Sequence, residues 1–137
     1  MATKITGGCL CGAVRYECSA DPMFAANCYC RDCQHSSGTA MASVMLVPKS
    51  AFKISKGTLK HYEVTGDSGG KVSRGFCADC GSPILSMISA SSEVVAIKAG
   101  SLDNTGIFNP MVSVYMASAP SWAPVHPDLP KFDKQPG

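Results

Sequence analysis

The sequence predicts an all-β domain built mainly from antiparallel sheets, with one or two short helical turns. Thirteen glycines and nine prolines are spread along the chain and separate short apolar runs, a pattern typical of a β fold with many turns. Hydrophobic residues make up 45% of the 137 residues and charged residues 16%, which is enough apolar surface for one core. This length favours a single domain over residues 1–137.

The expected strands are short runs rich in apolar or alternating residues, each bounded by Gly, Pro, Ser, Asn or Asp. The first run alternates between apolar and polar residues, as a half-buried strand does. In chain order the expected strands are Ala13–Glu17, Ala42–Leu46, Phe52–Ile54, Leu59–Val64, Val72–Phe76, Ile84–Met87, Val94–Ala99 and Met111–Met116.

One short helix is expected at Arg31–Ser37. Cys30 and Cys33 are three residues apart, so one helical turn would bring both thiols to the same side. Gly38 would then end the helix. The proline-rich stretch 119–137 predicts an extended tail that packs over the domain, with Trp122 as its anchor.

Composition argues against several classes of protein. No apolar run approaches the roughly 20 residues of a membrane-spanning helix. The first seven residues lack the apolar stretch of a signal peptide, so a cytoplasmic location is expected. The net charge of +2 is too small to indicate a nucleic-acid or membrane partner, and the sequence does not specify an oligomeric state.

Eight cysteines carry most of the functional information. Disulfides need an oxidising compartment, whereas closely spaced thiols suit a small cation better than bridges between distant segments. Metal binding is therefore the favoured interpretation. Seven of the cysteines form short-spaced groups: Cys9 with Cys11, Cys28 with Cys30 and Cys33, and Cys77 with Cys80.

The seven grouped cysteines divide into four and three. A structural zinc site uses four protein ligands, and two short-spaced pairs from separate segments, Cys9/Cys11 and Cys77/Cys80, can supply them. Each pair is followed by glycine, which permits a tight turn around the metal. The remaining group would leave a zinc ion with an open position. One cluster of all seven thiols is the less economical alternative.

Cys18 belongs to no tight group. Its favoured interpretation is a buried core cysteine. The alternative is that it supplies a fourth ligand to the Cys28, Cys30 and Cys33 group.

Five parts of the chain carry a resemblance to a known family: Gly8–Tyr16, Cys28–Cys33 with Gly38, Phe76–Ser82, Ala99–Asp103 and Trp122. Together and in this order they resemble the glutathione-dependent formaldehyde-activating enzyme family, whose domain also occurs in centromere protein V. The likeness extends from about residue 7 to residue 122.

The resemblance implies a β fold of the Mss4-like kind, a structural zinc on Cys9, Cys11, Cys77 and Cys80, and a second zinc on Cys28, Cys30 and Cys33. It also implies a carbon–sulfur lyase activity that joins glutathione and formaldehyde. Tyr29 stands where members of the family often carry histidine.

The expected reaction begins with a small thiol such as glutathione at the open position of the second zinc. The thiolate then adds to a small aldehyde such as formaldehyde. His35 and Tyr29, with Asp32 beside them, are candidate proton donors. Arg31 and Arg74 are candidates for binding the carboxylates of the thiol.

Two other classes of function remain open on the sequence. A non-catalytic binding module would use both zinc sites for shape, with Cys18 or His35 closing the second site. A metal or thiol sensor would exchange ions at the exposed three-cysteine group.

Overall fold

A computed structural model of the chain describes residues 4–66 and 69–135. Within these ranges the chain forms ten strands, one α-helix and five short 3-10 helices. The strands and the helix are β1 (Ile5–Gly8), β2 (Arg15–Cys18), β3 (Phe24–Cys28), α1 (Arg31–Ser37), β4 (Ala42–Pro48), β5 (Phe52–Lys56), β6 (Leu59–Thr65), β7 (Lys71–Cys77), β8 (Pro83–Ile88), β9 (Val94–Lys98) and β10 (Val112–Val114).

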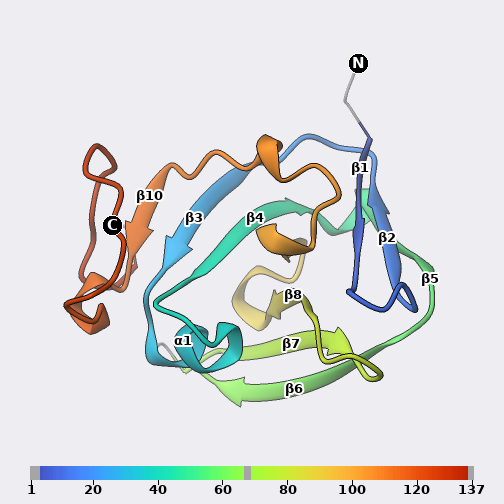
Figure 1. Ribbon diagram of the computed structural model, residues 1–137, viewed down its shortest axis with the longest axis horizontal. Helices are drawn as coiled ribbons and strands as arrows, with labels where there is room; N and C mark the ends of the chain where they lie inside the picture. Colours follow the sequence, from blue (N-terminus) through green and yellow to red (C-terminus); the bar gives the residue numbers. More distant parts are fainter. Residues whose placement is uncertain (1–3, 67–68, 136–137) are drawn as a thin grey trace.

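The strands form two sheets, which confirms the predicted all-β class. A three-stranded sheet has the order β1-β2-β5, and a seven-stranded sheet has the order β10-β3-β4-β9-β8-β7-β6. All pairs are antiparallel except β10 with β3, which is parallel. Figure 1 shows the β1–β2 hairpin at one end of the molecule and the C-terminal tail, beside β10, at the other.

The core lies between the three-stranded sheet and one face of the seven-stranded sheet. Tyr16 of β2 and Cys18 belong to the same buried cluster as Met45 of β4 and Ile97 of β9. Successive side chains of a strand point to opposite faces, so the residues between these core positions point away from the core. That second face of the large sheet lines a cavity, which makes it the surface available for chemistry.

Each strand expected from the sequence overlaps an observed strand, but β1 and β3 were not predicted. The sequence of β1 is ITGG, and that of β3 is FAANC. Gly and Ala are weak strand formers. The two β-branched residues of β1, Ile5 and Thr6, are too short a run to mark a strand, and β3 has no β-branched residue. Pairing with neighbouring strands fixes both segments, β1 with β2 and β3 with β4.

The helix occupies the predicted range Arg31–Ser37. Its N-cap is Cys30, whose Sγ accepts a hydrogen bond from the Cys33 backbone N–H at 3.2 Å. Its C-cap is Gly38, with φ 75° in the left-handed region that glycine adopts without strain. The cysteine that begins the helix therefore also belongs to the second thiol group.

The C-terminal tail is not held by Trp122. That side chain is 67% exposed, so its predicted role as anchor is wrong. Backbone hydrogen bonds connect the tail to β10 and the turn after it: Ser113 N–H to Pro130 O at 2.9 Å and Phe132 N–H to Ser113 O at 2.9 Å. The hydroxyl of buried Tyr29 donates to the carbonyl of Pro124 at 2.7 Å.

Among the described residues, no helix has the length and apolarity needed to cross a bilayer.

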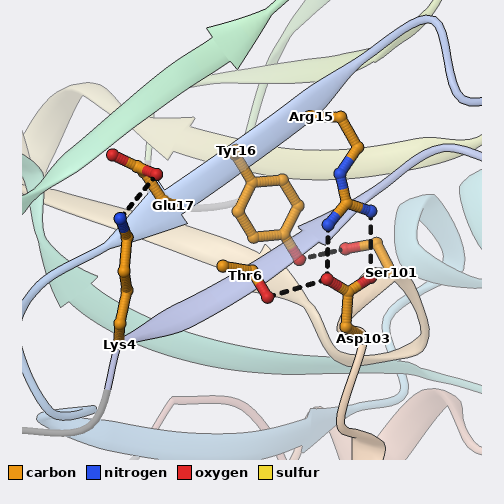
Figure 2. Close-up of polar contacts among 7 residues, drawn as sticks. All are labelled: Lys4, Thr6, Arg15, Tyr16, Glu17, Ser101 and Asp103. Carbon is orange, nitrogen blue, oxygen red and sulfur yellow. Dashed lines mark hydrogen bonds and ion pairs between the residues drawn. The ribbon is translucent and has the colours of Figure 1, made fainter.

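A polar network ties the loop after β9 to the small sheet (Figure 2). Asp103 accepts hydrogen bonds from Thr6 Oγ1 at 2.7 Å and from both terminal nitrogens of Arg15. The hydroxyl groups of Tyr16 and Ser101 lie 2.7 Å apart. This loop therefore couples the hairpin of the first thiol pair to the strand that carries Lys98.

Gly7 lies at the closest approach between β1 and this loop. A Cβ atom there would overlap the Tyr16 hydroxyl and the carbonyl oxygen of Ser101. Gly100 in the same loop has no heavy atom within 4 Å of the corresponding Cβ position. The two glycines thus form a matched pair for substitution.

We expect Gly7→Ala to lower the free energy of unfolding by about 2 kcal/mol or more, because the loop or the hairpin must move. Gly100→Ala should change stability by less than about 1 kcal/mol. Urea denaturation followed by circular dichroism measures both. Equal stability of the two variants would contradict the close packing of β1 on the loop.

Candidate metal centres and the adjoining cavity

The first thiol group joins two turns that are distant in the chain. Cys9 and Cys11 lie between β1 and β2, whereas Cys77 ends β7 and Cys80 lies in the turn before β8. The four Sγ atoms all lie within 4.8 Å of one another. The Sγ of Cys11 is 3.6 Å from that of Cys9 and 3.7 Å from that of Cys77.

These separations suit a tetrahedral ion. Zinc bound to four thiolates at about 2.3 Å has sulfur atoms about 3.8 Å apart, which is close to the two observed distances. Four sulfur donors from the protein complete that coordination, so the group can hold a metal ion with no open position. The fit to a divalent metal supports the sequence-based division of the cysteines.

Backbone and hydroxyl groups support Cys9 and Cys80 as anions. Val14 N–H donates to Cys9 Sγ at 3.2 Å, and the Ser82 hydroxyl lies 3.2 Å from Cys80 Sγ. Hydrogen bonds from Ser82, through its side chain and then its backbone, lower the pKa of the Cys80 thiol to about 5. A metal-ligating cysteine binds as thiolate, so this arrangement favours the form that a metal needs.

Both turns contain the glycines that the sequence indicated. Gly12 has φ 80° and Gly81 has φ 78°, in the left-handed region. Their backbone N–H groups donate to Cys9 O at 3.2 Å and to Cys77 O at 2.8 Å. Each turn folds back behind its cysteine pair, which leaves the two sulfur atoms of the pair pointing to one side.

The second thiol group lies within a single short segment. Cys28 ends β3, Cys30 caps α1, and Cys33 lies in the first turn of that helix. Their Sγ atoms also lie within 4.8 Å of one another. No other Cys, His, Asp or Glu among the described residues joins this group, so these residues supply three ligands and leave one position free for a further donor.

Two basic side chains lie beside these thiols. Arg74 Nη2 is 4.0 Å from Cys33 Sγ, and Lys98 at the end of β9 is only 9% exposed. Hydrogen bonds from Cys28 and Cys30, followed by the charges of Lys98 and Arg74, lower the pKa of the Cys33 thiol to about 2. Burial lowers the pKa of Lys98, and the negative charge of Cys33 opposes that effect.

A cavity of about 600 Å³ opens in front of the three thiols. Its wall includes Arg74, Ser86 and Lys98, which lie on the adjacent strands β7, β8 and β9. Ser86 Oγ and Arg74 Nε are buried without a hydrogen-bond partner in the part of the chain that the structure describes. Buried polar atoms are normally satisfied, so these two atoms mark a place for a polar ligand group.

The predicted site residues separate into two sets. Arg31 and Arg74 line the cavity together with Asp32 and the three thiols. His35 is exposed and lies 3.3 Å from a terminal nitrogen of Arg31, and neither it nor Tyr29 is part of the cavity wall. The catalytic roles of Tyr29 and His35 therefore stay predictions.

Cys18 lies in neither thiol group. Its side chain is fully buried in the core, as expected for a packing cysteine.

Lys98 and Ser86 are cavity residues that were not predicted from the sequence. A signal for Lys98 was present: it is the single charged residue at the end of the apolar run VVAIK. A charged residue is rarely buried without a partner, but the run alone does not show that the strand end is buried. Serine is too common in this chain for Ser86 to stand out.

Comparisons with known proteins agree with the resemblance that the sequence motifs indicate. The family model described as "Glutathione-dependent formaldehyde-activating enzyme" matches residues 4–118. The comparison with curated proteins gives no match. Among solved structures, the crystal structure of a Rhodobacter sphaeroides protein is 18% identical, with a TM-score of 0.60. The alignment covers 93% of this chain and 98% of that one, and it shows a shared fold.

The two thiol groups should respond differently to loss of one ligand. We expect Cys80→Ser to remove one equivalent of metal and to lower the free energy of unfolding by about 3 kcal/mol or more, because it opens a link between distant turns. Cys33→Ser should also remove one equivalent of metal but keep a cooperative unfolding transition near that of the parent protein. Its group connects residues only five positions apart.

Metal analysis and urea denaturation of the purified variants measure both effects. Unfolding of Cys33→Ser at the same urea concentration as Cys80→Ser would contradict the assignment of different roles to the two groups.

Proposed function

The chain belongs to the glutathione-dependent formaldehyde-activating enzyme family, and on that premise we propose that it is a zinc-dependent carbon–sulfur lyase. In this proposal it activates a small thiol such as glutathione for addition to an aldehyde such as formaldehyde, or for release from the adduct. The matched region contains all seven grouped cysteines.

One observation carries the proposal: a three-thiol group faces a cavity with two basic side chains beside it. The four-thiol group supplies its own complete ligand set, whereas Cys28, Cys30 and Cys33 leave room for a donor from a substrate. The binding-module alternative would use Cys18 or His35 to close this site, whereas the sensor alternative would leave it open. Cys18 lies in the core and His35 is exposed outside the cavity wall, so the geometry favours an open site.

The charges around the second group favour an anionic ligand. Three thiolates with a divalent ion have one net negative charge, and Lys98 and Arg74 contribute two positive charges. The sum is one positive charge, and because Lys98 and the Arg74 Nε are buried, their electrostatic interactions are stronger than in water. A thiolate entering this site would bring the local charge to zero.

The three cysteines would hold zinc, and Arg74 and Lys98 would orient the reacting groups. Bound zinc would keep an incoming thiol in its nucleophilic thiolate form. The thiolate sulfur then forms a bond to the carbonyl carbon, and the π electrons of the carbonyl move to its oxygen. The proton that the thiol lost is replaced by one delivered to this oxygen, so the adduct contains all the atoms of thiol and aldehyde.

Side chains on β7, β8 and β9 are suited to stabilise the oxygen as its charge develops. Lys98, Arg74 and the Ser86 hydroxyl are donors on one cavity wall, and their positions are fixed by the sheet before substrate binds. Donors fixed in advance are a main source of rate enhancement in such reactions. Exposed Arg31 at the cavity rim is suited to bind a carboxylate of glutathione.

We expect Lys98→Met to lower kcat/KM for exchange between glutathione, formaldehyde and their adduct by about 10- to 100-fold, because a donor to the developing oxyanion is lost. The exchange rate is measured by nuclear magnetic resonance on the metal-loaded protein. Lys60→Met, which alters an exposed lysine on β6, is the control and should leave the rate unchanged.

Two results would count against the enzyme proposal. One is exchange no faster than the uncatalysed reaction when both metals are bound. The other is a failure of the protein to bind glutathione in a calorimetric titration. A loss of activity equal in Lys98→Met and Lys60→Met would contradict the role of Lys98 alone.

A further inference from the structure

The cavity wall formed by the large sheet changes in chemistry along its strands. Strand pairing aligns Cys28 with Ala42 in one row, and Ala26, Val44 and Lys98 in the next. A third row contains Phe24, Leu46, Ala96, Ser86 and Arg74, and a fourth contains Val72 and Ile88. Apart from Ala42, all these residues line the cavity.

Moving away from the thiols, the second and third rows contain the donor groups Lys98, Ser86 and Arg74 beside apolar side chains, and the fourth row is apolar throughout. We call the residues Phe24, Val44, Leu46, Val72, Ile88 and Ala96 the apolar lobe. All but Ala96 are only partly buried, although each faces the cavity. These side chains are therefore not covered by the protein's own packing, and an apolar ligand group would remove them from water.

Neither reactant of the family's named reaction fills this lobe. Formaldehyde has a single carbon and no substituent. Glutathione is a polar tripeptide with two carboxylates, and burying its charged or amide groups against the lobe would leave them without hydrogen bonds, which is costly. A cavity of about 600 Å³ is large enough for a drug-sized organic molecule.

We infer that the carbonyl partner of the thiol carries an apolar substituent of several carbons, and that this substituent occupies the apolar lobe. This inference rests on the proposed function. It replaces formaldehyde as the preferred partner with an aldehyde that has an alkyl or aryl group.

The order of groups along the wall matches the order of atoms in such an adduct. A thiol–aldehyde adduct has sulfur, then a carbon with a hydroxyl group, then the substituent. The wall has the thiol group of Cys28 in its first row. The donors Lys98, Ser86 and Arg74 lie in the second and third rows with part of the apolar lobe beside them, and only lobe residues lie in the fourth row. Rows are two residues apart, or about 7 Å, and a six-carbon chain extends roughly 6 Å, so it spans one row.

The peptide part of glutathione is suited to a different region, the rim of the cavity. The cavity rim is formed by Arg31 and Asp32 of α1 and by residues 133–135 of the tail. These residues are exposed and mostly charged. Glutathione can therefore keep its carboxylates and amides at the rim while the substituent points along the sheet.

Stable thioethers test the inference by binding alone. S-methylglutathione and S-hexylglutathione share the peptide and differ by five methylene groups. Since each fully buried methylene increases affinity about fourfold, we expect S-hexylglutathione to bind the metal-loaded protein at least tenfold more tightly in calorimetric titrations. Hexanal should likewise be preferred over formaldehyde in kcat/KM with glutathione.

Substitutions within the lobe locate the effect. Leu46→Gln and Ile88→Gln place an amide in the lobe and should each reduce the hexyl preference at least threefold, with little change for the methyl compound. Met87→Gln is the matched control, because Met87 neighbours Ile88 on β8 but packs against the core on the opposite face. It should keep the full hexyl preference.

The outcomes separate this inference from the function on which it rests. Catalysed exchange of formaldehyde together with equal binding of the two thioethers would overturn the apolar substituent and leave the enzyme proposal standing. Absence of both thioether binding and catalysed exchange would overturn both. A hexyl preference that Met87→Gln abolishes and the two lobe variants retain would also overturn the inference.

Discussion

The packing of the three-stranded sheet on one face of the seven-stranded sheet is the contact on which the rest of the structure depends. It buries Tyr16, Met45 and Ile97 almost completely. Because side chains alternate along a strand, this contact also determines what the other face presents. Lys98 follows Ile97, and Ser86 follows Leu85, so both polar residues point into the cavity as a direct result of their neighbours' burial in the core.

The two thiol groups differ in how far apart along the chain the segments are that they connect. The four-thiol group joins the turn after β1 to the turn after β7, so it fastens elements from both sheets outside the cavity. The three-thiol group is local to the end of β3 and the start of α1. A ligand can therefore exchange at the second group without loosening a long-range link, and this separation allows reactivity in a domain of this size.

Much of the fold and both thiol groups could be predicted from short-range patterns in the sequence. Alternating strands, the helix at Arg31–Ser37 and the two cysteine groups were all predicted, since each depends on residues close in sequence or on metal-ligand counting. Strands β1 and β3 were missed because pairing, and not propensity, fixes their glycine- and alanine-containing runs. Trp122 was expected to anchor the C-terminal tail, but it is exposed, because burial depends on what the fold brings near a side chain. The positions of Lys98 and Ser86 beside the thiols arise from sheet register, which no single segment encodes.

The buried lysine links the structure of the site to its chemistry. A lysine with 9% exposure pays a desolvation cost that an opposite charge must offset. Lys98 has no carboxylate within ion-pair distance among residues 4–66 and 69–135, so the thiol group is its source of negative charge. Once those thiolates are shared with a divalent ion, part of that charge is neutralised, and Lys98 with Arg74 is left in excess. In the proposed function, this excess positive charge would favour an anion that supplies the fourth, sulfur ligand, and the burial of Lys98 would strengthen that preference.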